Sequence, residues 1–328
     1  MDIIKVTEFI TQQFGQGTPF VRIPGDASDR QYFRIMPEKE DPRILMWLPP
    51  GHDVGVQRFL GRKLASAGLS VPTIQIISDD SQLVVMEDFG ASRLKETLLG
   101  APGEEWRIYR QAMAAIPALH PIDCVSLLPY DADAYRRELA LFVQWYLPSH
   151  LIHPTAQQLD EFSEINARVI QDLMNISPVF VHRDYHAENL FFLPERESIA
   201  QIGMIDFQDA LLGHPLYDLV SLLTDARRDV DKDMSDALKQ QFMLEIGWQK
   251  DQFEVAYAQL SFQRNAKILG IFKRLAQRDQ KPAYLALMPR VEAHLLEALQ
   301  HPGCEPWRAW LCKLKAETRV SLALWDQL

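Results

Sequence analysis

Short apolar runs and amphipathic stretches alternate along the first 90 residues. Apolar positions recur at helical spacing over residues 3–14 and 56–67, and Gly68 ends the second stretch. The runs with the length and the residue types of strands are 20–24, 31–35, 43–48, 73–78 and 82–86. The pattern therefore predicts five strands with two helices among them.

Beyond this region the apolar positions recur mostly at helical spacing. Core-facing stripes run through residues 135–146 and 159–173, and the stretch 251–277 predicts the longest helix. Two apolar runs, 178–181 and 199–205, interrupt this pattern and predict buried strands. Further helices are expected over residues 216–226, 282–299 and 307–325. Strands gathered first, with helices mostly after them, indicate an α+β chain.

Composition narrows the class of protein. Of the 328 residues, 47% are hydrophobic and 24% are charged, which is ordinary for a globular chain with a sizeable core. The formal net charge of -10 argues against a general nucleic-acid or anionic-membrane binder, because clustered Lys and Arg hold both partners. A nucleotide is still compatible with this charge, since Mg²⁺ can supply the missing positive charge.

The N-terminus and the cysteines predict a reducing, aqueous compartment. The first residues lack the basic-then-apolar order of a signal peptide, and no apolar run approaches the roughly 20 residues of a membrane span. Cys124, Cys304 and Cys312 form no C-x-x-C pair and are expected to be reduced. We expect a soluble, cytoplasmic protein with a small-molecule substrate and no evident nucleic-acid, membrane or protein partner.

The candidate chemistry is concentrated between His182 and Asp206. This stretch reads H-R-D-x-x-x-x-N and, after the next predicted strand, I-D-F. It is the catalytic-loop pattern of the protein-kinase-like fold, in which the first Asp accepts the proton of the acceptor hydroxyl. Asp184 is thus the predicted catalytic residue, and Asn189 and Asp206 are the predicted Mg²⁺ ligands. Any one of them alone would more often be a turn residue, so the combined spacing is what favours catalysis.

The loop after the first predicted strand is a candidate cover for the phosphates of ATP. Gly25, Ala27 and Ser28 are small enough for backbone N–H groups to approach a nucleotide. An ordinary hairpin turn explains the same residues equally well.

A positively charged anchor for the phosphates is also needed. A kinase-like fold would supply a Lys on the third strand and a Glu on the following helix, and this chain has neither. We expect Arg34, Arg30 or a basic residue of helix 56–67 to reach the phosphates instead.

The run Met86-Glu87-Asp88-Phe89-Gly90 contains the D-F-G that binds metal in protein kinases. The metal-binding Asp must follow the catalytic loop, however, and Asp88 lies far ahead of Asp184. Met86, Glu87 and Asp88 are therefore assigned to a hinge whose backbone could bond the adenine edge. We expect the two carboxylates to face solvent or to cap a helix.

Two further charged residues have both a structural and a functional interpretation. Asp218, in the first turn of helix 216–226, either favours the helix dipole or accepts bonds from the catalytic loop and holds it rigid. Arg264 lies on the core stripe of helix 251–277, where a charge needs a partner, either a buried Asp or a substrate group. The nearby charges of Lys267, Lys273 and Arg274 are interpreted as solvated surface.

Together these motifs resemble the aminoglycoside phosphotransferase and choline-kinase branch of the protein-kinase-like superfamily. The branch pattern H-x-D-x-x-x-x-N, I-D and G-x-P-x-x-D-L is present at His182–Asn189, Ile205-Asp206 and Gly213–Leu219. The resemblance implies a bilobal fold, with a β-rich nucleotide-covering lobe over residues 1–89 and a mainly helical catalytic and substrate-binding lobe over 90–328. It also implies ATP and Mg²⁺ as cofactors.

Within the branch, the amino-acid sequences of four segments are most similar to those of the bacterial anomeric N-acetylmuramate/N-acetylglucosamine kinases. The segments are Gly25–Ser28, His182–His186, Ile205–Ala210 and Gln263–Asn265. Those enzymes phosphorylate the C1 hydroxyl of the sugar. The resemblance implies an amino-sugar kinase in which His182 and Asp218 support the catalytic loop, and Arg264 and Asp209 contact the substrate.

Other functions remain open from the sequence. The same loop would phosphorylate an aminoglycoside, choline or homoserine. A protein kinase is disfavoured because Gly213-His214-Pro215 follows Asp206 almost at once and leaves little room for an activation segment. A nucleotide-binding scaffold without activity is favoured by the missing Lys and opposed by the intact Asp184, Asn189 and Asp206.

Overall fold

The computed structural model describes residues 3–24, 29–123 and 127–318. The chain divides into two compact units. Unit 1 comprises Met1–Pro102 and Asn189–Gln208, and unit 2 comprises Gly103–Glu188 and Asp209–Leu328. The unit boundary after Pro102 and the second segment of unit 1 differ from the expected lobes 1–89 and 90–328, and that division by function stays a prediction.

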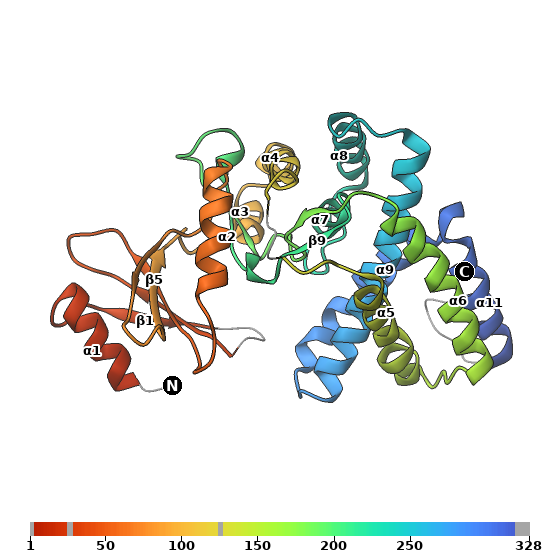
Figure 1. The fold of residues 1–328 in the computed structure, drawn as a ribbon, viewed down its shortest axis with the longest axis horizontal. Helices are drawn as coiled ribbons and strands as arrows, with labels where there is room; N and C mark the ends of the chain where they lie inside the picture. The colour runs from red at the N-terminus through yellow and green to blue at the C-terminus, as the bar shows by residue number, and fades with distance from the viewer. Residues whose placement is uncertain (1–2, 25–28, 124–126, 319–328) are drawn as a thin grey trace. The chain divides into compact units, whose positions relative to one another are not determined.

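A five-stranded antiparallel sheet, whose strands β1 and β5 are labelled in Figure 1, forms the frame of unit 1. Its strand order is β1-β2-β3-β5-β4. Its strands are β1 (Phe20–Ile23), β2 (Gln31–Ile35), β3 (Arg43–Trp47), β4 (Ile74–Ile77) and β5 (Leu83–Glu87). All five were expected from the sequence, and each lies within one residue of its predicted ends. The α+β class is therefore confirmed.

Alternation along the strands gives this sheet two apolar faces. Helix α1 (Ile3–Phe14) packs Val6, Phe9 and Ile10 on the face that carries Leu45 and Val85. The opposite face carries Met46, Val84 and Met86 and packs against Val54, directly before helix α2 (Gly55–Ser66). Helix α3 (Leu94–Gly100) completes the first segment of unit 1.

The second segment of unit 1 is a hairpin of two short strands, β7 (Leu190–Phe192) and β8 (Ile202–Met204). The Met204 N–H donates to the Ser70 carbonyl at 2.9 Å, which joins the hairpin to the first segment. Gly203 is required there, because a Cβ would lie 2.8 Å from the Phe89 ring. The strand expected over 199–205 is shorter than predicted, since Ser198–Gln201 form a 3-10 turn, and β7 was not predicted.

Unit 2 is organised around helix α9 (Lys250–Gln277), which at 28 residues is the longest helix described, as expected (Figure 1). Helices α5 (Ala132–Leu141), α7 (Tyr217–Leu223) and α10 (Met288–Leu299) pack against it. The helices come so close that a Cβ at Gly270 would lie 2.4 Å from the Leu141 backbone.

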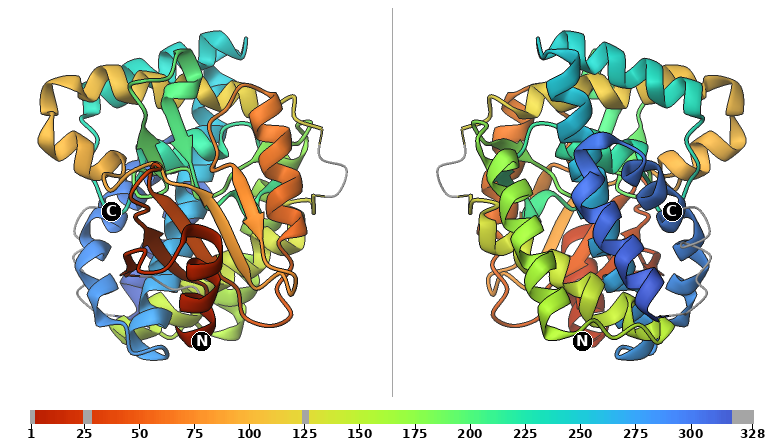
Figure 2. Two further views of the ribbon diagram at one scale, coloured as in Figure 1. Left: turned by 90° about the vertical axis from the view of Figure 1, so that its left-hand side faces the viewer. Right: turned by 90° about the vertical axis from the view of Figure 1, so that its right-hand side faces the viewer.

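The other elements of unit 2 lie around this core. Its further helices are α4 (Glu105–Leu119), α6 (Ala156–Met174), α8 (Lys232–Glu245) and α11 (Glu305–Thr318), and α6 and α11 lie side by side (Figure 2). Strands β6 (Val179–Val181) and β9 (Leu211–Gly213) pair antiparallel, and β9 was not predicted. No helix in the described ranges is long and apolar enough to cross a membrane.

Two helical stretches differ from the sequence expectation. The stripe over 135–146 is α5 followed by the π-helix η2 (Phe142–Tyr146). The helix expected over 282–299 is the 3-10 segment η6 (Pro282–Leu287) followed by α10, which has a proline in its first turn. A proline has no backbone N–H to donate and is accommodated at the start of a helix, which explains the new beginning there.

Candidate active site

The loop of residues 182–188, which follows β6 in unit 2, carries the predicted catalytic Asp184. Asp218, in the first turn of α7, accepts the backbone N–H groups of His182 at 2.7 Å and of Arg183 at 2.9 Å. Asp218 is only 2% exposed, and burial raises the pKa of its carboxyl to about 6 despite these bonds. The start of the loop is therefore tied to a buried carboxylate.

The rest of the loop has its own anchors within unit 2. The Tyr185 hydroxyl donates to the Ala112 carbonyl at 2.9 Å, and the Ala187 N–H donates to the Asp225 carboxylate at 3.0 Å. Glu188 forms an ion pair of 2.7 Å with Arg227. The start of the loop is thus held by Asp218 in α7, and its end is held by Asp225 and Arg227, which follow α7.

The backbone of this loop is strained directly before Asp184. Arg183 has a φ of 74°, in the left-handed region that residues other than glycine rarely adopt. Such conformations cost energy, persist only where neighbouring contacts hold them, and cluster at functional sites. Here the bonds to Asp218 hold Arg183, and the next residue, Asp184, is solvent-exposed.

The charges around Asp184 favour its ionised form. Burial of the surrounding site opposes ionisation, but Lys267, Arg264 and Arg183 outweigh it and lower the pKa of the Asp184 carboxyl. At neutral pH this carboxylate is therefore ready to accept a hydrogen bond and a proton from a hydroxyl group.

Two of these cations belong to a buried network on Glu138 of α5. Lys267 Nζ lies 2.8 Å from Glu138 Oε1, and Arg183 Nη2 lies 3.1 Å from the same oxygen. Gln263 Nε2 donates to the other carboxylate oxygen at 3.0 Å. The side chain of Lys267 is only 13% exposed, so its interpretation as solvated surface was wrong. Lys267 is buried because it lies one helical turn from Arg264, on the same core-facing side of α9.

Arg264 is buried, as its place on the core stripe predicted, and it is only 5% exposed. Its Nη2 donates to the Ser221 hydroxyl of α7 at 2.8 Å. Among the residues that the structure describes, no Asp or Glu forms an ion pair with it, and its Nη1 has no hydrogen-bond partner. The structural interpretation, a pair with a buried Asp, was therefore wrong.

In unit 1 the β7–β8 hairpin brings the two predicted metal ligands together. The Ile205 N–H donates to the Asn189 carbonyl at 3.0 Å, which extends the Leu190–Met204 pairing by one step. Asp206 follows directly, with a left-handed φ of 68° and an exposed side chain that accepts from Gln208 Nε2 at 2.6 Å. One amide oxygen and one carboxylate at the end of one hairpin are the hard oxygen ligands that suit Mg²⁺.

The hinge carboxylates are paired rather than solvated. Asp88, whose side chain is 4% exposed, accepts from Arg34 Nη2 at 2.9 Å and from the Gly90 N–H at 2.8 Å. Glu87 pairs with Arg196. The expectation that both carboxylates face solvent or cap a helix was wrong, because β2 and β5 are both paired to β3 and this brings Arg34 to Asp88.

The remaining candidates stand as follows. Arg34 is bonded to Asp88 and to the Gly90 carbonyl, and its phosphate role stays a prediction. Arg30 forms a side-chain hydrogen bond with Tyr32, which also interacts electrostatically with Asp206. The exposed Asp209 belongs to unit 2, and its carbonyl accepts from Arg183 Nη1 at 3.3 Å. Gly25, Ala27 and Ser28 lie outside the described residues.

Sequence reasoning did not single out Asp225, Glu138 or Tyr185. Glu138 and Tyr185 carried no signal that separates them from ordinary helix and loop residues. Asp225 directly follows the apolar helix α7 and its Thr224 cap position, which is a pattern that many turns share. Lys267 carried a signal, since it is three residues from Arg264 on a predicted helix.

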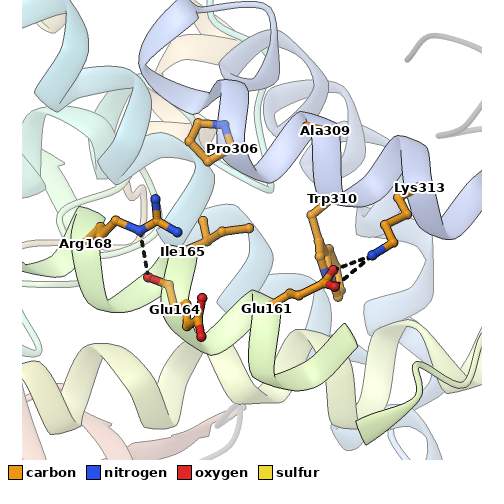
Figure 3. A pocket seen from close by; sticks show the side chains of 8 residues that line it. All are labelled: Glu161, Glu164, Ile165, Arg168, Pro306, Ala309, Trp310 and Lys313. Atoms are coloured by element: carbon orange, nitrogen blue, oxygen red, sulfur yellow. Dashed lines mark hydrogen bonds and ion pairs between the residues drawn. The ribbon is translucent and has the colours of Figure 1, made fainter. Parts of the chain in front are cut away.

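A surface pocket of unit 2 lies between α6 and α11 and contains none of these residues (Figure 3). Lys313 Nζ lies 2.8 Å from both carboxylate oxygens of Glu161 at one side of it, and Arg168 donates to the Glu164 carbonyl within α6. The Lys313–Glu161 pair joins the two helices, the Arg168 bond lies within α6, and neither contact offers an arrangement for catalysis.

Comparison with known proteins agrees with this assembly of motifs. The N-acetylmuramate/N-acetylglucosamine kinase of Caulobacter vibrioides is 35% identical over 335 residues, which cover 90% of this chain and 92% of that protein. The protein of the same name from Pseudomonas aeruginosa is 30% identical over 302 residues, which cover 89% and 87%.

Solved structures share the fold at low identity. A choline/ethanolamine kinase family protein from Mesorhizobium loti has a TM-score of 0.61 at 15% identity, over 95% of this chain and 99% of that one. An ADP-bound aminoglycoside phosphotransferase has a TM-score of 0.59 at 16% identity, over 88% and 96%. The profile of the phosphotransferase enzyme family matches residues 19–253, which include every segment of the catalytic-loop pattern. The chain therefore belongs to the phosphotransferase enzyme family.

Proposed function

We propose that the protein uses Mg-ATP to phosphorylate the anomeric hydroxyl of an N-acetyl amino sugar, N-acetylmuramate or N-acetylglucosamine. Family membership supports phosphoryl transfer, and the names of relatives that match about nine-tenths of the chain support the sugar. The observation that carries the proposal is Asp184, an accessible carboxylate that neighbouring cations keep ionised on an anchored loop. A cytoplasmic location, where ATP is available, belongs to the same proposal.

Asp184 is the proposed general base. It accepts a hydrogen bond from the sugar hydroxyl and takes its proton as the new O–P bond forms, while the bond from the γ-phosphorus to the leaving ADP oxygen breaks. Asp218 and Tyr185 fix the loop, so that the carboxylate is positioned before the sugar arrives. In this proposal catalysis consists mostly of positioning the sugar hydroxyl against the γ-phosphate and of neutralising the negative charge on the phosphates.

Asn189 and Asp206 are the proposed ligands of the metal. When bound there, Mg²⁺ supplies the positive charge that neutralises the β- and γ-phosphates. Gln208 donates to Asp206 at 2.6 Å and thereby orients its carboxylate. The backbone of Met86, Glu87 and Asp88 is proposed to bond the adenine edge, and the 25–28 loop is proposed to cover the phosphates.

The buried cation Arg264 argues against cationic acceptors. Of the three cations that act on the Asp184 carboxylate, Lys267 and Arg183 are paired with Glu138, whereas Arg264 bonds to a serine hydroxyl, and an aminoglycoside or choline would bring further positive charge beside it. A neutral or anionic hydroxyl compound is compatible with the same surroundings. The local charge therefore favours a sugar, although the net charge of the whole chain is -10.

A product screen tests this function. The protein is incubated with Mg-ATP and, separately, N-acetylmuramate, N-acetylglucosamine, choline, homoserine and an aminoglycoside, and phosphorylated product is measured by mass spectrometry. We expect product with the two amino sugars, bearing an acid-labile anomeric phosphate. Turnover of another acceptor alone would replace the substrate assignment. Absence of any product, together with a melting temperature raised by Mg-ATP, would instead indicate a binding scaffold.

Two variants test the mechanism. Asp184→Asn removes the base, and Asp206→Asn removes the charged metal ligand; we expect each to lower kcat by about 10³-fold or more. Asp172→Asn, at an exposed position of α6, is the matched control and should leave kcat unchanged. Full activity in either of the first two variants would refute the assigned roles.

A further inference from the structure

Among the residues that the structure describes, several buried polar atoms without hydrogen-bond partners lie in two short segments of unit 2, the catalytic loop and the middle of α9. They include Arg183 Nε, His186 Nδ1, Gln263 Oε1, Arg264 Nη1 and Asn265 Oδ1. Most buried polar groups in proteins are hydrogen-bonded, because an unpaired one costs free energy. A group of them beside a predicted catalytic residue indicates a place that a ligand completes.

Two of these residues are linked to the loop that carries Asp184: His186 belongs to it, and Arg264 donates to the Ser221 hydroxyl, which lies 3.5 Å from the Arg183 carbonyl oxygen. Arg264 and His186 both interact electrostatically with Asp184, and they also interact with each other. His186 is two residues after Asp184, is 8% exposed, and donates its backbone N–H to the Asp184 carbonyl at 3.1 Å. A substrate group bonded to Arg264 Nη1 and His186 Nδ1 would lie beside the loop that carries Asp184.

The chemistry of the two atoms selects the kind of group. Arg264 Nη1 can only donate. Burial and the charges of Arg227 and Arg264 lower the pKa of His186 against the opposing effect of Asp225 and Asp184, so its ring is neutral and Nδ1 can accept. A secondary amide offers one C=O acceptor and one N–H donor, whereas a carboxylate offers acceptors alone.

We infer that Arg264 and His186 bind the 2-acetamido group of the sugar, with Arg264 Nη1 donating to its carbonyl and His186 Nδ1 accepting its N–H. The inference rests on the proposed function, because the acetamido group on C2 is next to the anomeric hydroxyl on C1. It is also the substituent that N-acetylmuramate and N-acetylglucosamine share beside that hydroxyl. Arg264 and His186 then determine the specificity of the enzyme for N-acetylated sugars.

The rest of the Arg264 guanidinium is held in place by the protein. Nη2 donates to the Ser221 hydroxyl at 2.8 Å, and this hydroxyl lies 3.5 Å from the carbonyl oxygen of the strained Arg183. With Nη2 bonded in this way, Arg264 is less suited to grip a carboxylate with two parallel N–H groups. A single amide oxygen matches the nitrogen that is left.

The test compares two sugars in several variants. N-acetylglucosamine and glucose differ at C2, and the ratio of their kcat/KM values reports recognition of the acetamido group. A site that hydrogen-bonds this group should give a wild-type ratio of about 10² or more. We expect the ratio to fall at least tenfold in Arg264→Lys, Arg264→Met and His186→Phe. Arg278→Lys, directly after the end of α9 and exposed, is the matched control and should keep the wild-type ratio.

The outcomes distinguish a substrate-binding role of Arg264 and His186 from a structural one. If a variant lowers kcat/KM for both sugars by the same factor, Arg264 and His186 are structural and the inference is wrong. N-acetylmuramate is measured as a third substrate; if the loss is confined to it, Arg264 recognises the lactyl carboxylate, which also overturns the inference. If the wild-type protein phosphorylates no amino sugar, the proposed function fails, and the inference fails with it.

A binding measurement separates recognition from catalysis. Calorimetric titration of N-acetylglucosamine into the protein without nucleotide should give a Kd at least tenfold higher for Arg264→Lys than for the wild type. Circular dichroism establishes that each variant is folded, and Arg264→Lys keeps the buried charge where Arg264→Met removes it. An unchanged Kd in a folded Arg264→Lys protein would contradict the contact.

Discussion

The carboxylate of Asp218 accepts the backbone N–H of His182 at 2.7 Å, although 36 residues separate the two in the chain. The next N–H, of Arg183, is bonded to the other carboxylate oxygen at 2.9 Å. A buried charged acceptor thus holds two successive amides at the point where the backbone takes its left-handed turn before Asp184. Several measurable properties depend on this anchor.

Asp218→Asn should separate activity from stability. The asparagine amide keeps one oxygen that can accept a hydrogen bond, so one of the two loop N–H groups loses its bond. This loss lowers the free energy of unfolding by about 1–3 kcal/mol. The variant also removes the cost of burying the Asp218 charge, the cost that raises the pKa of this carboxyl to about 6. This gain in stability offsets a loss of similar size. We therefore expect kcat to fall about 10–100-fold, while urea unfolding gives a free energy within about 2 kcal/mol of the wild type. A variant that is unstable but fully active when folded would contradict the anchoring role.

The pH dependence of Asp218 has opposite signs for activity and stability. Because its folded pKa is raised to about 6, the carboxyl takes up a proton in the native state before it does so in the unfolded chain. Its contribution to stability therefore increases as the pH falls from 6 toward 4. Activity should decrease over the same range, because the neutral carboxyl holds the loop amides less strongly. A kcat profile without an acid limb near pH 6 would argue against this effect.

The ion pair between Glu138 and Lys267 should be a strong internal constraint. Lys267→Met leaves Glu138 without its nearest cation in a mostly buried position, and we expect about 3–5 kcal/mol of destabilisation. The double variant Glu138→Gln with Lys267→Met should recover much of this loss, which a double-mutant cycle measures. Because Lys267 also lowers the pKa of Asp184, the acid limb of kcat/KM should move to higher pH in Lys267→Met. Equal destabilisation in the single and double variants would show that the pairing is unimportant.

Arg34 and Asp88 offer a test of how the phosphates are anchored. If Arg34 acts by holding the hinge, Arg34→Ala and Asp88→Asn should each raise the KM for ATP about tenfold, and the double variant no further. If Arg34 contacts the phosphates, Asp88→Asn should leave this KM unchanged while Arg34→Ala raises it. Our expectation is the first result, since Arg34 is bonded to both Asp88 and the Gly90 carbonyl. Arg30→Ala, measured in parallel, tests the other arginine that was expected to reach the phosphates.

Two histidines of unit 2 should make the protein sensitive to acid. Burial lowers the pKa of His214 to about 3 and that of His120 to about 4, so neither binds a proton in the native state near pH 5. In the unfolded chain both histidines bind a proton below about pH 6.5. The free energy of unfolding therefore decreases as the pH falls below that value, by about 2 kcal/mol per histidine at pH 5. His214→Asn keeps an acceptor near the Leu216 N–H and should remove its share of the loss between pH 7 and 5. His153→Asn, at an exposed position, should leave the slope of urea stability against pH as it is.

Local pattern was sufficient for most elements. The strands of unit 1 have alternating apolar residues and turn residues between them, and the 28 residues of α9 carry an apolar stripe along their length. The short strands β7 and β9 were not predicted, because three residues are too few to show a period and their pairing depends on distant partners. The break before α10 depends on a proline whose effect a stripe alone does not show.

The sequence by itself determined the family motif, the fold class and the candidates Asp184, Asn189, Asp206, Asp218 and Arg264, because spacing along the chain carries that information. Only the tertiary structure decided the partners of these residues. It paired Arg34 with Asp88, Lys267 with Glu138, and Arg264 with a serine hydroxyl instead of a carboxylate. The physical reason is that a buried charge is satisfied by whichever group the fold brings within about 3 Å, and the distance along the chain says nothing about that group.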